Sequence, residues 1–417
     1  MAKRVTRCRI CGNTELVPII NLGTQCLTGV FPKHKNEKIT SGPLELLKCL
    51  DGDKEKNCGL VQLGSSYDKN EMYGDNYGYR SGLNDSMVSH LKDIANKICK
   101  VISLKDDDIV IDIGGNDGTL LSAFPQSMTG LISIDPTIAK FKKFYEKNIT
   151  QIPDFFSAQV IKKAMGNRRT KVVSSIAMFY DIEDPQDFAC QVNDILDDEG
   201  IWVLEQSYLP FMLKQNAYDT ICHEHMEYYA LKQLNWVLDG AGLKIIDIEY
   251  NDVNGGSIKL TAAKKDSKFR ECSEDIAQAT KNEYDMHLHT LKPFDIFRNK
   301  VEEHKEKLVA LIHDLNNQNR KVLAYGASTK GNVILQYCRL TNKDIPYIAE
   351  VNEDKFGRFT PHTFIPIISE KEAKAMNPDY FLVLPWHFKN NFLVREASYI
   401  KQGGKFIFPL PEIETVG

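Results

Sequence analysis

The stretch YDTICHEHMEYYA, residues 218–230, brings three acidic residues, two histidines and a cysteine together. A histidine beside a carboxylate can hold or release a proton at neutral pH, so this stretch could be an acid/base centre. Metal binding is one alternative, but H-E-H on a helix points the two rings apart, unlike the zinc-binding H-E-x-x-H. A surface helix with satisfied side chains is another. The surrounding segments must distinguish between these three interpretations.

A second group of reactive side chains is the cysteines near the N-terminus. Cys8 and Cys11 form a C-x-x-C pair, Cys49 and Cys58 form a wider pair, and a glycine follows each pair. Four thiolates complete a tetrahedral zinc site and leave no open position for catalysis. We therefore predict one structural zinc ion, with a loop at Leu50–Asn57 that lets both sulfurs of the second pair converge. Four unrelated thiols are the alternative.

The most informative stretch is DDDIVIDIGGNDGTLLSAF, which predicts a buried strand over 109–113, a glycine turn and a helix beginning at Thr119. Its glycine spacing differs from the dinucleotide G-x-G-x-x-G, and it lacks the Lys-Ser/Thr pair of a P-loop. The form D-x-G-x-x-x-G, over 112–118, is typical of class I methyltransferases that bind S-adenosylmethionine (AdoMet). The next strand ends in Asp135, about 20 residues after the turn, where an acid can bind ribose hydroxyls.

This interpretation predicts a cofactor site. Gly114 and Gly118 would shape the turn, Asp112 and Asn116 would orient the methionine part, and Asp135 would hold the ribose. The full predicted set is Asp112, Gly114, Asn116, Asp117, Gly118, Asp135, Pro136, Met178 and Phe179. The acid/base stretch follows the later strand IWVLEQSY, so we expect it at the carboxyl edge of the sheet, where ligands bind in open α/β folds.

A second α/β unit follows a polar helical region, roughly 269–319. KVLAYGASTKGNVILQYC again predicts strand, glycine turn and helix, but we recognise no acid at the distance expected for a dinucleotide ribose. Ser328, Thr329 and Lys330 at the helix start would suit a phosphate instead, and a structural turn with a solvated lysine is the alternative. The predicted fold is α/β, with a zinc-binding domain (1–70), an AdoMet-binding Rossmann-like domain (71–265) and a C-terminal Rossmann-like domain (266–417).

Composition limits the classes of function. The chain has 417 residues and a formal net charge of −4, with 42% hydrophobic residues. Negative charge argues against nucleic-acid binding driven by bulk electrostatics. No apolar run approaches the roughly 18 residues that span a bilayer, and the basic N-terminus lacks the apolar segment of a signal peptide. We expect a cytoplasmic protein with no membrane or nucleic-acid partner.

Together these segments resemble the nucleotide-sugar C-methyltransferases. The resemblance spans nearly the whole chain and rests on the cysteine module and on YGDNYGYRSG, IDIGGNDGTLL, YDTICHEHMEYY, NGGSIKL, YGASTKGN and LPWHF…QGGKFIFP, in that order. It implies AdoMet-dependent methylation of a carbon, C-3 by expectation, in a 4-keto-6-deoxy sugar linked to dTDP or GDP. It implies a monomer that acts in the biosynthesis of a branched deoxysugar.

The resemblance also implies roles for residues. A carbon beside a ketone is acidic enough for an enzyme base to remove its proton, and the enolate then takes the methyl group. His225 matches the family's base, Glu224 would hold the sugar or tune the histidine, and His223 is the rival base. Tyr77 or Tyr79 would donate a hydrogen bond to the enolate oxygen. The implied substrate-binding residues are Arg80, Cys222, Asn254, Gly326, Ser328, Lys330 and Trp386.

Three positions depart from the family pattern. Asp181, Cys222 and Asn254 stand where a histidine, a tyrosine and a histidine are usual. These departures leave the reaction class in place but put the sugar, the methylated carbon and the nucleotide in doubt. We expect Asp181 to act beside His225 and raise its pKa, as an adjacent carboxylate does.

Two other functions compete with this one. An O- or N-methyltransferase acting on a small metabolite would keep the AdoMet turn but would need no base beside an acidic carbon. A zinc-bearing RNA-binding or scaffold protein would be expected to carry positive charge, and the net charge is −4.

Overall fold

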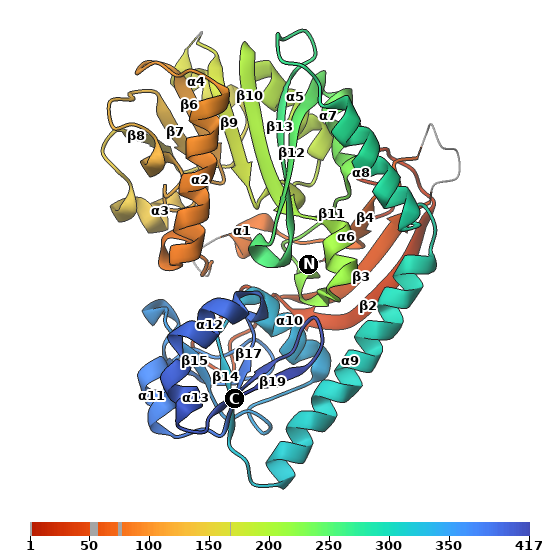
Figure 1. The fold of residues 1–417 in the computed structure, drawn as a ribbon, viewed down its shortest axis with the longest axis vertical. Coiled ribbons are helices and arrows are strands. Elements are labelled where there is room, and N and C mark those ends of the chain that lie inside the picture. Colours follow the sequence, from red (N-terminus) through yellow and green to blue (C-terminus); the bar gives the residue numbers. More distant parts are fainter. Residues whose placement is uncertain (1, 51–56, 74–76, 167) are drawn as a thin grey trace.

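A computed structural model describes residues 2–50, 57–73, 77–166 and 168–417. Three sheets dominate it (Figure 1): a seven-stranded sheet in the upper half, a six-stranded sheet in the lower half, and the long strands β2 and β3 beside both. The predicted loop at Leu50–Asn57 falls mainly on 51–56, outside the described residues. The α/β fold predicted from the sequence is confirmed, whereas the division at 70/71 and 265/266 remains a prediction.

The central sheet has the strand order β12-β13-β10-β9-β6-β7-β8. Strands β6 to β10 run parallel, and β13 is antiparallel to β10 and β12. Its strands are β6 (Ile109–Ile113), β7 (Leu131–Ile134), β8 (Ile149–Ile152), β9 (Thr170–Ile176), β10 (Leu196–Ser207), β12 (Leu243–Asn251) and β13 (Ser257–Lys264). This order forms the Rossmann-like core of the molecule.

Helices cover both faces of the central sheet. In β6, Ile109, Ile111 and Ile113 pack on one face and Val110 on the other, as the two-residue period of a strand requires. Helix α2 covers the Val110 face, while α4, α5 and α7 cover the opposite one. The helices are α2 (Asp85–Val101), α3 (Ile138–Phe141), α4 (Ala158–Met165), α5 (Pro185–Ile195), α6 (Leu209–Lys214) and α7 (Leu231–Gly240).

The predicted helix at Thr119 is replaced by a short 3-10 helix, Leu121–Ala123. The cause is Pro125, because the residue before a proline is pushed out of the helical region. Phe124 accordingly has φ −77 and ψ 160.

The N-terminal sheet has the order β11-β4-β3-β2, so one of its strands comes from the acid/base stretch. Strand β11 pairs antiparallel with β4, with Glu227 opposite Gln62 and Tyr228 opposite Val61. Its elements are β2 (Leu16–Cys26), β3 (Ser41–Cys49), β4 (Val61–Leu63) and β11 (Glu227–Tyr228), with β1 (Lys3–Arg4), β5 (Ser65–Ser66) and α1 (Lys69–Met72) beside them.

The C-terminal sheet has the order β16-β15-β14-β17-β18-β19. Its strands are β14 (Val322–Tyr325), β15 (Ile348–Glu350), β16 (Ile367–Ser369), β17 (Tyr380–Val383), β18 (Lys405–Phe408) and β19 (Glu414–Val416). Its helices are α10 (Thr329–Cys338), α11 (Glu370–Ala375), α12 (Lys389–Arg395) and α13 (Ala397–Lys401). The predicted polar helical region forms α8 (Ser273–Asp285) and α9 (Lys292–Asn317), and α9 runs alongside β2 in Figure 1.

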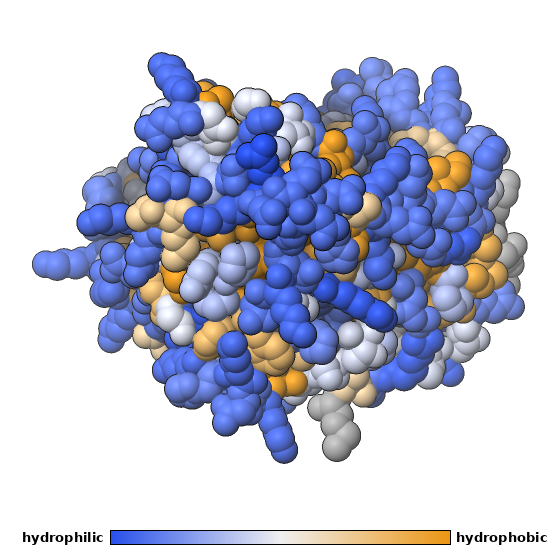
Figure 2. Space-filling model, turned by 90° about the horizontal axis from the view of Figure 1, so that it is seen from below, coloured by the Kyte–Doolittle hydropathy of each residue, from blue (hydrophilic) through white to orange (hydrophobic). Residues whose placement is uncertain are grey.

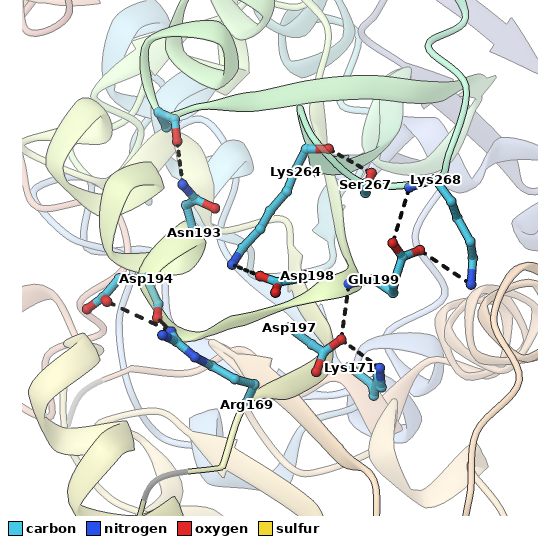
Figure 3. A network of polar contacts seen from close by, with 11 residues as sticks. Arg169, Lys171, Asn193, Asp194, Asp197, Asp198, Glu199, Lys264, Ser267 and Lys268 are labelled. Carbon is cyan, nitrogen blue, oxygen red and sulfur yellow. Dashed lines mark hydrogen bonds and ion pairs between the residues drawn. The ribbon is translucent and has the colours of Figure 1, made fainter.

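Charged side chains gather at the amino ends of β9 and β10, away from the carboxyl edge of the sheet (Figure 3). Lys171 pairs with Asp197 at 2.6 Å and Lys264 pairs with Asp198 at 2.9 Å. Exposed pairs of this kind contribute about 0–1 kcal/mol each. The face viewed from below in Figure 2 is mostly hydrophilic, with hydrophobic residues scattered over it. Within the part of the chain that is described, no helix is long and apolar enough to span a bilayer.

Candidate active site

A cavity of about 810 Å³ opens at the carboxyl edge of the central sheet. Four parallel strands end at it, and they contribute the Gly114–Asn116 turn, Asp135, Met178 and Glu205 to its wall. Segments on either side of 74–76 also line it. The volume lies within the range of small-molecule sites, and the position is where open α/β sheets bind ligands.

The glycine turn brings backbone close to this cavity. Gly114 and Gly118 both have positive φ, and a Cβ on Gly115 would lie 2.2 Å from the Ser133 Oγ. At the end of β7, Asp135 Oδ2 accepts a hydrogen bond from the Asn116 N–H at 2.9 Å, and its Oδ1 accepts one from the Thr137 N–H at 2.6 Å. Asp135 is therefore fixed against the turn, where a ribose-binding acid belongs.

The other predicted cofactor residues have different surroundings. Asp112 is buried, accepts a hydrogen bond from the Ser174 hydroxyl at 2.7 Å, and has its pKa raised to about 7 by burial. Pro136 and Met178 line the cavity. Phe179 is 1% exposed and packs in the core against Trp202 at 5.5 Å, so the structure gives it no place on the cavity wall.

Asn116 and Asp117 bind the segment 79–82 through hydrogen bonds. Asn116 Oδ1 accepts a hydrogen bond from the Ser81 N–H at 3.0 Å, and its Nδ2 donates to the Tyr79 carbonyl at 3.2 Å. Asp117 Oδ2 accepts a hydrogen bond from the Gly82 N–H at 2.9 Å. Arg80 lies 3.5 Å from Asp117 and 4.0 Å from the centre of the Phe144 ring, outside the cavity lining.

We expect the change Asp135→Asn to weaken AdoMet binding at least tenfold, about 1.4 kcal/mol. The amide keeps the shape of the side chain but replaces one acceptor oxygen with a donor NH₂ group. That donor would face the N–H groups to which Asp135 now accepts hydrogen bonds. Titration calorimetry measures the Kd. The control is Asp266→Asn, a change at an exposed turn. Equal affinity in both variants and the unaltered chain would contradict the role of Asp135.

The acid/base stretch is buried and largely non-helical. After a 3-10 turn at Tyr218–Thr220 the chain extends into β11, and Cys222 and His223 are fully buried. The interpretation as a surface helix is therefore wrong. Among the described residues, the only group of three or more side chains placed to hold a metal is Cys8, Cys11, Cys49 and Cys58, so the H-E-H sequence forms no such group there.

The two histidines lie in different surroundings. The His223 ring is 4.7 Å from the Tyr67 ring, and the His225 ring is 4.2 Å from the Tyr180 ring. Burial lowers the pKa of His223 to about 4. His225 Nδ1 donates a hydrogen bond to the Thr220 carbonyl at 2.9 Å, so Nε2 carries the lone pair of the neutral ring.

The expected rise in the pKa of His225 through Asp181 is wrong. Burial, and after it the Lys330 ammonium, lower the pKa of His225 to about 3, and Asp181 is not among the causes of the shift. Burial also raises the pKa of Asp181 well above its usual range, with the Glu224 carboxyl adding to the rise. His225 lines a small cavity of about 10 Å³, whereas its neighbour Met226, like Asp181, lines the large one.

The two predicted tyrosines line the large cavity, whereas Glu224 is buried beside Thr28 and lines neither cavity. The Thr28 hydroxyl donates to Glu224 Oε2 at 3.5 Å, and burial raises the pKa of Glu224. Tyr77 lines the cavity, and its carbonyl accepts a hydrogen bond from Lys140 Nζ at 2.7 Å. Tyr79 also lines it but is 48% exposed.

The predicted residues of the C-terminal part reach the same region. Lys330 is half-buried, its Nζ donates to the Asn254 carbonyl at 2.8 Å, and burial lowers its pKa, so its ammonium group is held at the Asn254 loop. Asn254 lines the large cavity. Trp386 Nε1 donates to Asp219 Oδ2 at 2.8 Å.

An acid that was not predicted from the sequence lies beside the second glycine turn. Gly326 has φ +84, and Ser328 caps α10 by accepting a hydrogen bond from the Gly331 N–H at 3.0 Å. Glu350, the last residue of β15, accepts one from the Ala327 N–H at 2.9 Å. This repeats the arrangement of Asp135 against the first turn. The signal was present in the sequence, as an acid ending the short apolar strand after the glycine turn.

The zinc ligands converge as predicted. The sulfur atoms of Cys8, Cys11, Cys49 and Cys58 all lie within 4.8 Å of one another. Cys8 Sγ is 3.4 Å from Cys58 Sγ, and Cys11 Sγ is 3.7 Å from Cys49 Sγ. Tetrahedral zinc with Zn–S bonds of about 2.3 Å places sulfurs about 3.8 Å apart, so the four side chains fit the metal.

Three family models match consecutive parts of the chain. They describe a zinc binding domain over residues 8–73, a methyltransferase domain over 87–248 and a C-methyltransferase C-terminal domain over 252–411. The C-methyltransferase NovU of Streptomyces niveus is 26% identical over 419 residues, which is 100% of this chain and 98% of that protein.

Solved structures resemble the chain more distantly. An S-adenosylmethionine-dependent methyltransferase from Clostridium acetobutylicum is 12% identical, covers 42% of this chain and 91% of its own, and has a TM-score of 0.35. The mitomycin 7-O-methyltransferase MmcR is 12% identical, covers 44% of this chain and 55% of its own, and also has a TM-score of 0.35.

Proposed function

The chain belongs to the AdoMet-dependent C-methyltransferases that carry an N-terminal zinc-binding domain, and we propose that it methylates a nucleotide-linked 4-keto-6-deoxy sugar at C-3. AdoMet supplies an electrophilic methyl group. The protein must then make a carbon nucleophile beside that methyl group and keep it from water. A carbon next to a ketone meets this need once a base removes its proton.

The observation that supports this proposal most is the placement of His225. Its Nδ1–H is fixed by the Thr220 carbonyl, which leaves Nε2 as a proton acceptor on a neutral ring. The residue that follows it lines the large cavity. In the proposed reaction Nε2 takes the proton from C-3, and the electrons of the broken C–H bond form the enolate. The enolate carbon then bonds to the methyl group, and the electrons of the S–CH₃ bond remain on sulfur.

The enolate oxygen needs hydrogen-bond donors. Burial raises the pKa of Asp181 and of Glu224, which favours the protonated form that can donate a hydrogen bond. Tyr77 lines the large cavity, as Asp181 does, and its hydroxyl can also donate a hydrogen bond. We assign these groups to the ketone and the neighbouring hydroxyls of the sugar, and His223, which packs on Tyr67, to a structural position.

The C-terminal sheet would hold the nucleotide. Glu350 lies against the Gly326 turn as Asp135 lies against the Gly114 turn, and an acid there suits a sugar hydroxyl. Lys330 contacts the Asn254 carbonyl and would act near the reacting end of the substrate.

We expect Glu350→Gln to raise the KM for the nucleotide sugar about tenfold while the Kd for AdoMet stays unchanged. The reason is that Glu350 lies in the C-terminal sheet, away from the AdoMet turn. Initial rates at varied substrate measure the effect. Glu353→Gln, at an exposed position three residues later, is the control. An unchanged KM would remove Glu350 from the nucleotide site.

The experiment that tests the function uses the zinc-loaded protein with AdoMet and a panel of dTDP- and GDP-linked 4-keto-6-deoxy sugars in deuterium oxide. The expected product has one new methyl group on carbon, located by NMR. Deuterium uptake without methylation would show a working base and the wrong sugar. Neither uptake nor methylation with any sugar would overturn the enolate mechanism and favour O- or N-methylation of a small metabolite.

A further inference from the structure

Arg9 lies in the sequence between Cys8 and Cys11, the first two zinc ligands, and its side chain is buried in the protein. The side chain is 3% exposed. Its Nη1 donates to the Leu63 carbonyl at 2.8 Å, and its Nη2 donates to the Ser66 hydroxyl at 2.9 Å. Its backbone N–H donates to Gln62 Oε1 at 2.9 Å. Arg9 is thus tied to β4 and β5, the strands beside the acid/base stretch.

Two carboxylates lie near Arg9: Glu183, whose Oε1 is 3.9 Å from Arg9 Nε, and the closer Glu227, two residues after His225. Arg9 Nε lies 3.4 Å from Glu227 Oε1, and the Glu227 side chain is fully buried. Neither Glu227 oxygen has a hydrogen bond within the described residues, so the guanidinium is its main electrostatic contact. Glu227 also lines the small cavity that His225 lines. Removing one side of this pair would leave a buried polar group without its partner, two residues from His225.

Backbone contacts reinforce this link. The Leu63 N–H donates to the Met226 carbonyl at 2.8 Å, which adds to the pairing of β4 with β11. On the far side of β11, Gln233 Nε2 donates to the Cys58 carbonyl at 2.7 Å, directly at a zinc ligand. The acid/base stretch is therefore held from both ends by the zinc-binding module, as a strand of its sheet.

We propose that Arg9 and Glu227 are positioning residues, through which the zinc-binding module sets the place of His225. The zinc fixes the C-x-x-C turn, the turn fixes the Arg9 guanidinium, and the guanidinium fixes Glu227 and with it the segment that carries the base. In this view the metal acts on catalysis through geometry, without touching substrate. The proposal rests on the proposed function for its effect on turnover, but its effect on the segment does not depend on that function.

The test compares Arg9→Met and Glu227→Gln with Arg9→Lys, which keeps the positive charge. Zinc content is measured by elemental analysis and AdoMet affinity by calorimetry. Hydrogen exchange is followed in peptides spanning 221–229 and, as an internal reference, 109–118. The matched control is Lys171→Met, which breaks the Lys171–Asp197 pair at the far end of the central domain (Figure 3).

We expect one zinc per chain and AdoMet affinity within twofold in all variants. In Arg9→Met and Glu227→Gln the 221–229 peptides should exchange at least tenfold faster, and substrate deuteration and kcat should fall together by at least tenfold. Arg9→Lys should recover part of each loss, and Lys171→Met should change neither. Unaltered exchange at 221–229 with zinc retained would overturn the proposal. Loss of zinc and of AdoMet binding in both Arg9→Met and Glu227→Gln would also overturn it, because the pair would then be purely structural.

If the protein methylates none of the sugars, the exchange measurement still decides whether Arg9 and Glu227 position the segment. Faster exchange at 221–229 would then support the link while the proposed function failed. If the protein does methylate a sugar, slower turnover with unchanged exchange would show a catalytic effect of these residues that does not pass through the position of the segment.

Discussion

His225→Ala is expected to lower kcat by roughly 10²–10⁴-fold and to abolish substrate deuteration to the same degree, because a general base contributes about that much. AdoMet affinity should stay within twofold, since the glycine turn and Asp135 lie at other strand ends. Rapid-mixing kinetics and NMR-detected deuterium uptake measure the two losses. Equal rates in the variant and the unaltered chain would exclude His225 as the base and favour heteroatom methylation.

The comparison variant is His223→Ala. His223 packs on Tyr67, its ring lies in the N-terminal module, and it lines neither cavity. Its loss should reduce stability more than the rate of deuteration per folded molecule. A larger loss of deuteration in His223→Ala than in His225→Ala would exchange the roles of the two histidines.

The pH dependence follows from the low pKa of His225. A ring with a pKa of about 3 stays neutral, and therefore basic, throughout the range in which an ordinary histidine becomes protonated. Activity should not fall as pH drops through 6.5. Stability behaves differently: between pH 6.5 and about 3 the unfolded chain binds the proton and the folded one does not, so His225 makes folding less favourable as pH falls. The unfolding midpoint in urea at pH 7 and pH 5 measures this.

Cys58→Ser is expected to remove zinc and to lower the free energy of unfolding by more than about 3 kcal/mol, because metal binding and folding are coupled in small zinc modules. The sulfur lies 3.4 Å from that of Cys8, at the centre of the cluster. Elemental analysis and urea unfolding measure the two effects. Turnover should fall with zinc content, since the module carries β11.

The control for this change is Cys190→Ser, because Cys190 is exposed on α5 and belongs to no cluster. It should leave zinc content and unfolding unchanged. A Cys58→Ser protein with full zinc content and an unchanged urea midpoint would show that Cys58 is not a ligand.

Local sequence patterns predicted most of the fold. Buried strands such as 109–113 and 322–325 stand out because apolar residues run between charged ends and glycine turns. The helix predicted at Thr119 does not form, although the strand–turn–helix pattern is typical, because Pro125 favours extended backbone at the residue before it. The pairing of β11 with β4 could not be predicted, because it joins segments far apart in the sequence and two residues carry no periodicity.

The candidate site was less predictable than the fold. Residue types near the turns were enough to single out Asp135 and the cysteines. The pKa of a titratable group depends on its burial, however, and burial depends on the packing of all three sheets. Asp181 and His225 show this most clearly: proximity in the family pattern suggested a raised pKa for the histidine, whereas desolvation lowers it. Glu350 was missed because its strand, Ile348–Glu350, is only three residues long.

The origin of β11 affects how the chain is made. On the ribosome, β2, β3 and β4 emerge long before residues 227–228, so β4 first has an exposed edge with unpaired backbone groups. The cysteines can gather around zinc at that stage, but the sheet is closed only when the central domain has been synthesised. A nascent or truncated chain ending before 227 would therefore expose this edge to other chains. Completion of the N-terminal sheet and arrival of the segment that carries the proposed base are one event in the assembly of this protein.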